Sequence, residues 1–177
     1  MFQDPDFQQS FAATLSINNK PVVLAQKLLQ KKLDDPEATE EQRRIYREEL
    51  EYTHNLLTFG DGVTPVLFFF GYHDGVYIIE INDNDRYDNT ASMEGSLRDW
   101  TLFDGTDPTY FRIKNAEGDT LKMTDLSDQH DILLYSGPQE RPVCTYGELP
   151  YVQVITDLPN RGGQLAAFRV NITKRYS

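Results

Sequence analysis

The spacing of apolar residues changes near residue 60 and divides the chain into two parts. Up to residue 58, apolar side chains recur every three or four positions, which is typical of amphipathic helices. From Val63 onward they recur at every second position, and turn-forming residues interrupt the pattern at short intervals. We therefore expect an α+β protein, with a helical N-terminal third in residues 1–60 and an antiparallel β-sandwich or barrel-like domain in residues 61–177.

Three helices are predicted in the N-terminal third. The first follows an N-cap aspartate and Pro5, a residue that is favourable in the first helical turn. The second begins after Asn19 and ends near two lysines, which complement the helix dipole. The third begins with a capping box formed by Thr39 and Gln42, and it runs to Gly60.

The C-terminal part predicts an antiparallel sheet. Strands Val66–Tyr72 and Val76–Ile81 are apolar on both faces and are joined through Asp74-Gly75, a pair that favours a tight hairpin turn. The polar residues 82–95 indicate a long loop. Further strands are expected at residues 97–103, 110–115, 120–126, 132–136, 151–157 and 164–176.

Composition narrows the range of partners. The chain has 177 residues with 17 Lys and Arg against 28 Asp and Glu, a net charge of −11. This charge argues against nucleic acid and anionic membranes as partners, because both are bound through positive charge. No apolar run reaches the roughly 20 residues of a membrane helix, and the first residues of the given sequence do not have the pattern of a signal peptide. With the single cysteine Cys144, the sequence indicates a soluble protein of the cytoplasm or a virion, and the compartment itself stays open.

One segment suggests a metal site. Asp83, Asp85 and Glu94 occupy positions 1, 3 and 12 of a calcium loop of the EF-hand type. Asp88 stands where that loop requires glycine, and a strand rather than a helix precedes the segment. We therefore expect a solvated loop, no metal and no cofactor, and leave open whether residues 82–95 bind a cation.

Catalytic motifs are lacking in the sequence. His54, His73 and His130 are the candidate acid–base groups, and Cys144 is the candidate nucleophile. None lies in a motif typical of an enzyme family, so we assign no catalytic residue and lean towards a protein that is not an enzyme. A hydrolase that uses residues from the 82–95 loop is the third-ranked hypothesis.

The N-terminal segment suggests a contact with another protein. Phe2, Phe7, Phe11 and Leu15 form an apolar stripe, and a short isolated helix is stable only when it docks on something. Residues 1–17 would then be an arm that docks on a neighbouring subunit, with those four side chains as partner-binding residues. The alternative is that the stripe packs on the protein's own sheet.

Two functions from different classes follow. The leading hypothesis is a non-catalytic structural or assembly protein, a subunit of a larger complex such as a virion capsid or tail component, which acts through protein–protein contacts with other subunits. The alternative is a module that binds glycans, in which Trp100, Tyr110, Tyr146 and Tyr151 supply stacking surfaces.

A resemblance bears on the C-terminal residues. The run Asp131-Ile132-Leu133-Leu134-Tyr135-Ser136-Gly137-Pro138 and the final strand around Phe168-Arg169-Val170-Asn171 resemble the second half of a CUB-type sandwich. The paired cysteines typical of that family are missing here, because the chain has only one cysteine. We therefore transfer neither the ligands nor the calcium site of that family.

Overall fold

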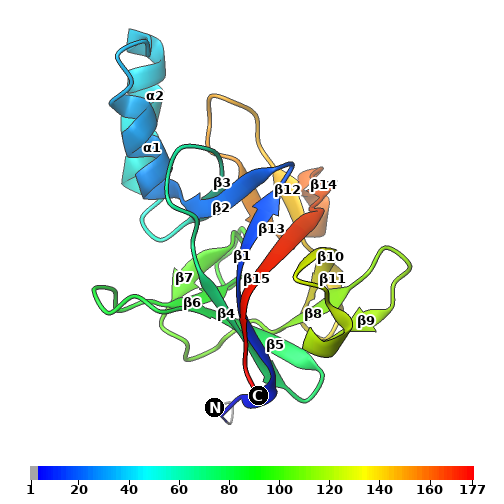
Figure 1. Cartoon of the computed structure of the whole chain (residues 1–177). Helices are drawn as coiled ribbons and strands as arrows, with labels where there is room; N and C mark the ends of the chain where they lie inside the picture. Colours follow the sequence, from blue (N-terminus) through cyan, green and yellow to red (C-terminus); the bar gives the residue numbers. More distant parts are fainter. Residues whose placement is uncertain (1–3) are drawn as a thin grey trace.

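The computed structural model describes residues 4–177, and most of the regular structure is β-strand (Figure 1). The α-helices in this part of the chain are α1 and α2, at Ala25–Leu33 and Glu40–Tyr52. The strands are β1 Asp6–Ile17, β2 Lys20–Leu24, β3 Leu57–Phe59, β4 Phe68–His73, β5 Val76–Ile81, β6 Thr90–Ser92, β7 Thr101–Phe103, β8 Phe111–Lys114, β9 Thr120–Leu121, β10 Gln129–Ser136, β11 Arg141–Pro142, β12 Cys144–Tyr146, β13 Val154–Thr156, β14 Gln164–Leu165 and β15 Phe168–Arg175. Two short 3-10 helices lie at Met123–Asp125 and Pro159–Arg161.

Six strands close into an antiparallel barrel. They follow the order β1, β15, β10, β8, β5 and β4, and the barrel closes because β4 pairs with both β5 and β1. The first and last strands of the chain therefore lie side by side, with Leu15 opposite Val170. The remaining strands extend this sheet at its margins, and a separate sheet of three strands has the order β13, β12, β14.

The predicted α+β class with a helical N-terminal third is wrong, because most of the regular structure in the described residues is β-strand and residues 6–17 form barrel strand β1. Phe11 and Leu15 are four residues apart, and this spacing places side chains on one face of a helix and equally on one face of a strand. Ala13 lies between them and Ile17 two positions after Leu15, and both are buried, so the side chains facing the core from residue 11 to residue 17 follow the period of two of a strand. Burial in the barrel therefore outweighed the helix signals around Pro5. Phe7 lies on the outer surface instead, where the pairing of β1 with β4 is irregular between Asp6 and Phe11.

A two-residue turn follows β1 and explains a second correction. Asn18 and Asn19 have positive φ angles of 53° and 63°, the conformation that joins two strands in a tight hairpin. The predicted second helix consequently starts late: residues 20–24 form strand β2, and α1 begins at Ala25. Asparagine tolerates positive φ better than most residues, so the Asn-Asn pair was an unused hairpin signal.

The predicted helix after Thr39 is confirmed. The backbone N–H of Gln42 donates to Thr39 Oγ1 at 3.1 Å, and the N–H of Thr39 donates to Gln42 Oε1 at 2.9 Å, so the capping box is complete. The helix ends at Tyr52 instead of Gly60, because residues 57–59 form β3. Together α1 and α2 make a hairpin that projects from one end of the barrel (Figure 1).

The β pattern after residue 60 was predicted more accurately than the N-terminal part. The β4–β5 hairpin turns at Asp74 and Gly75, with φ angles of 47° and 96°. The segment predicted as a long loop contains the additional strand β6. At the centre of the core, the Trp100 ring stacks on Phe68 with 5.4 Å between the ring centroids, and its indole is completely buried.

Candidate functional site

The four predicted partner-binding residues have different surroundings. Phe2 lies outside the described residues. Phe11 and Leu15 are buried in the barrel, where the Phe11 ring stacks on Phe70 at 4.6 Å between centroids, so they present no surface to a partner. Phe7 is 51% exposed, and its part in partner binding stays a prediction.

Phe7 belongs to a group of three rings on the outer surface of the barrel, which we call the aromatic cluster: Phe7, Phe69 and Tyr176. Their centroids are 6.3 Å, 5.9 Å and 5.4 Å apart, and the rings come from β1, β4 and the end of the chain after β15. The Nζ atom of Lys174 lies 4.7 Å from the centroid of the Tyr176 ring. Because β1 pairs with both β4 and β15, the closed barrel brings these three segments together.

The segment 82–95, which matches part of a calcium-loop pattern, is held by hydrogen bonds within itself and to Asn55. Asp83 Oδ1 accepts the N–H of Asp85 at 3.0 Å, as in an Asx turn. Arg86 and Asp88 both hydrogen-bond to Asn55, beyond the end of α2. Within residues 4–177, no group of three or more His, Cys, Asp or Glu side chains is arranged to hold a metal ion.

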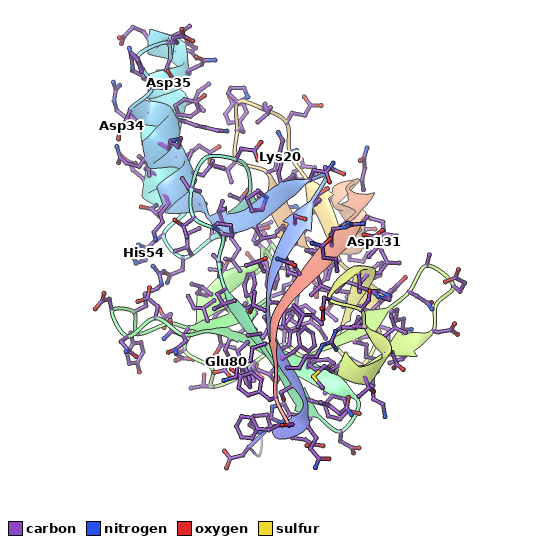
Figure 2. The ribbon with its side chains drawn as sticks, viewed as in Figure 1. Lys20, Asp34, Asp35, His54, Glu80 and Asp131 are labelled. Atoms are coloured by element: carbon purple, nitrogen blue, oxygen red, sulfur yellow. The ribbon has the colours of Figure 1, made fainter. Side chains whose placement is uncertain are left out.

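The candidate catalytic groups His54, His130 and Cys144 have different surroundings in the structure. His54 is exposed beyond the end of α2, at the base of the helical hairpin (Figure 2). His130 Nδ1 accepts the backbone N–H of Ser127 at 3.2 Å, within a local turn. Burial raises the pKa of the Cys144 thiol, so the thiol is protonated at neutral pH and is a weak nucleophile.

Carboxylate side chains also lie near His73. A hollow of about 590 Å³ is lined by His73, Asp104 and Asp107, among others.

Loss of hydration, together with the nearby Asp107 and Asp104 charges, raises the pKa of Glu94. The Oε2 atom of Glu94 is buried and has no hydrogen-bond partner in the described part of the chain. The folded structure therefore disfavours the charged form of the Glu94 carboxyl group.

Of the four aromatic residues considered for stacking, only two have widely exposed rings. Trp100 is buried in the core, and Tyr110 is half-buried. Tyr146 and Tyr151 are 44% and 53% exposed, and both line a hollow of about 670 Å³ next to the three-stranded sheet. We call this hollow the Tyr146 groove; its walls come from residues 145–148, 151–154 and 161–164.

Arg161 holds the Tyr146 ring from one side. Its guanidinium carbon lies 4.7 Å from the centroid of the Tyr146 ring. The same guanidinium forms an ion pair with Asp99, and its Nη1 donates to the carbonyl oxygen of Leu97 at 3.1 Å. The side chain of Arg161 is 16% exposed, so these contacts keep it in place. Sequence reasoning missed Arg161 because the turn at residues 159–163 gave no sign of a contact with residue 99.

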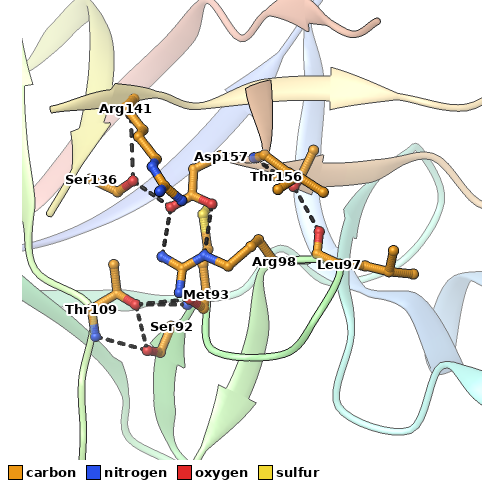
Figure 3. A network of polar contacts seen from close by, with 10 residues as sticks. Ser92, Met93, Leu97, Arg98, Thr109, Ser136, Arg141, Thr156 and Asp157 are labelled. Carbon is orange, nitrogen blue, oxygen red and sulfur yellow. Dashed lines mark hydrogen bonds and ion pairs between the residues drawn. The ribbon is translucent and has the colours of Figure 1, made fainter. Parts of the chain in front are cut away.

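Near residues 97–99, Arg98 and Asp157 form an ion pair in which the Asp157 side chain is completely buried (Figure 3). The carboxylate of Asp157 accepts hydrogen bonds from Arg98 and from the hydroxyl of Ser136. The Asp157 carboxylate raises the pKa of Arg98, which stays charged. Thr156 Oγ1 donates to the carbonyl oxygen of Leu97 at 3.1 Å. The segment between β13 and the turn at residues 159–163 is thereby tied to residues 97–99.

In three comparisons with known proteins, no family model, no curated protein and no solved structure matched the chain. The resemblance of the C-terminal residues to a CUB-type sandwich has no support from these comparisons. In the structure, β8, β10 and β15 belong to the closed barrel, β9 and β11 pair with β8 and β10, respectively, and β12, β13 and β14 form the small three-stranded sheet. None of the helices described in residues 4–177 is long and apolar enough to cross a membrane.

Proposed function

We propose that this protein is a non-catalytic subunit of a larger assembly and acts through protein–protein contacts. The observation that carries the proposal is the aromatic cluster, in which Phe7 packs on Phe69 and Tyr176 while half of its own surface stays exposed. Aromatic side chains are enriched at protein interfaces, because each ring buries a large apolar area on contact and loses little conformational entropy.

The fold suits this role because the barrel interior is filled. Phe11, Phe70 and Trp100 are completely buried, and a filled barrel supports surface groups rigidly. Rigid support lowers the entropy that binding would otherwise lose in ordering the cluster.

The surroundings of the cluster indicate the chemistry of the partner. Lys174 lies on the Tyr176 ring and forms no ion pair with any described residue. A complementary surface would therefore offer an apolar hollow for Phe7 and a carboxylate for Lys174. Such a surface could belong to a subunit of any large assembly, and a virion capsid or tail is included in the proposal.

Affinity purification from the native source, with mass spectrometry of the captured proteins, tests the proposal. We expect the wild-type chain to bring down a partner in a fixed molar ratio and Phe7→Ser to lose it. Tyr87→Ser is the matched control, because Tyr87 is 88% exposed and lies outside the aromatic cluster. Both variants should keep the wild-type melting temperature within a few degrees, as exposed positions do.

Two results would contradict the proposal. One is that the protein is isolated from its native source as a discrete monomer with no bound partner. The other is a partner that Phe7→Ser and Tyr87→Ser both retain, since binding would then use another surface.

A further inference from the structure

The Tyr146 groove lies at the end of the molecule opposite the aromatic cluster, next to β12 and β14 (Figure 1). Its volume of about 670 Å³ falls within the range of about 300–1,000 Å³ that is usual for small-ligand sites. The groove therefore supports an inference independent of the proposed protein contact.

The first observation is that Tyr146 is exposed and yet held in position. Arg161 covers one side of the ring, and Asp99 and the Leu97 carbonyl oxygen hold Arg161. The ring therefore does not have to be ordered when a ligand stacks on its free face. Fixed aromatic rings of this kind suit flat apolar surfaces, such as the C–H face of a pyranose ring.

The second observation concerns polar groups around the groove. The side chains of Glu148 and Gln164 and the hydroxyls of Tyr146 and Tyr151 form no hydrogen bond with any group in residues 4–177. They combine acceptors and donors, and a sugar hydroxyl is both a donor and an acceptor. This mixture fits a polyhydroxyl ligand better than it fits an apolar peptide.

One wall of the groove contains Gly162 and Gly163, which have no side chains to fill it. A Cβ atom on Gly163 would overlap the carbonyl oxygen of Thr145, so only glycine allows the two backbones to approach this closely. A Cβ atom on Gly162 would meet no atom within 4 Å, so this side of the groove is open. A chain of sugars could therefore continue past the wall.

The charges of the groove favour a neutral ligand. Arg161 is already neutralised by Asp99, whereas Glu148 has no cationic partner among the described residues. An acidic sugar would approach Glu148 in a protein whose net charge is −11, and like charges raise the free energy of binding.

We propose that the Tyr146 groove binds a neutral glycan, with sugar rings on Tyr146 and Tyr151 and sugar hydroxyls on Glu148 and Gln164. The test is an array of neutral and acidic oligosaccharides probed with the full chain, followed by calorimetric titration of the oligosaccharides that bind. We expect only neutral oligosaccharides to bind. Tyr151→Ala should weaken their binding about tenfold, because it removes one stacking surface.

Matched variants separate stacking from a general loss of structure. Tyr151→Phe keeps the ring and should bind within about threefold of the wild type. Tyr52→Ala removes a ring that is 83% exposed on α2 and lies outside the groove, and should bind like the wild type. The side chain of Tyr151 makes no ring contact with a described residue, so Tyr151→Ala should fold normally.

Three results would overturn the inference: no binding on the array, binding of acidic oligosaccharides alone, or equal affinities of Tyr151→Ala and Tyr52→Ala. None of these results bears on the protein contact proposed for the aromatic cluster, because that contact is tested with Phe7→Ser.

Discussion

Arg98 and Asp157 form a bidentate ion pair, with Nε–Oδ1 and Nη2–Oδ2 distances of 2.9 Å and 2.8 Å. The Asp157 side chain is completely buried, whereas that of Arg98 is 28% exposed. The pair joins positions 59 residues apart in the sequence, and Ser136 donates a further hydrogen bond from β10.

Asp157→Ala should lower the free energy of unfolding by about 2–4 kcal/mol, because the variant leaves Arg98 and Ser136 without their acceptor. Urea unfolding measures the loss. Asp128→Ala is the matched control: it removes an ion pair with Arg175 in which the Asp128 side chain is 84% exposed, and should cost less than about 1 kcal/mol. Similar losses in both variants would show that burial of the Arg98–Asp157 pair contributes little.

The barrel position of β1 predicts a contrast between two phenylalanines. Phe11→Ala removes a fully buried ring and should destabilise the protein by about 3–5 kcal/mol. Phe7→Ala changes a half-exposed ring on the same strand and should cost about 1 kcal/mol or less. If chemical denaturation gave a small loss for both, residues 6–17 would be an arm that contributes little to the barrel.

The capping box at the start of α2 predicts a helix-specific effect. Thr39→Ala removes the acceptor for the N–H of Gln42 and should destabilise the protein by about 1 kcal/mol. Thr39→Ser keeps a hydroxyl at the same position and should restore most of the loss. Hydrogen exchange of the first turn of α2 measures both effects, and equal protection in the two variants would contradict the prediction.

The raised pKa of Glu94 predicts that the stability of the protein depends on pH. The Glu94 pKa is raised in the folded protein, so the folded state binds the proton more tightly than the unfolded state. The free energy of unfolding therefore falls as the pH rises through the range between the ordinary pKa and the raised one. Glu94→Gln should be more stable than the wild type at neutral pH, by less than about 1 kcal/mol because the side chain is only half-buried.

Thermal unfolding at two pH values checks this assignment. Below about pH 3, more than one unit under the ordinary glutamate pKa, Glu94 is protonated in both states and the gain of Glu94→Gln should disappear. A gain of equal size at low and neutral pH would show that the effect is not electrostatic. Asp61→Asn is a suitable control, because Asp61 is exposed and lies in the loop after β3.

The tyrosines of the groove show how far sequence reasoning reached. The sequence singled out four aromatic residues for stacking, and the structure leaves Tyr146 and Tyr151 exposed while it buries Trp100. Aromatic type alone does not distinguish a core ring from a surface ring, because both environments use large apolar side chains. The position of Arg161 on the Tyr146 ring depends on its ion pair with Asp99. Residues 99 and 161 are far apart in the sequence, so no local pattern predicts their contact.

By itself, the sequence determined the elements that local interactions specify. The capping box of Thr39 and Gln42 and the Asp74-Gly75 turn act between neighbouring residues, so their patterns were sufficient. Only the tertiary structure decided whether Phe11 and Leu15 lie in a helix or in a strand. Their spacing of four suits a helix and a strand equally, and the free energy gained by closing the barrel through β1 selected the strand.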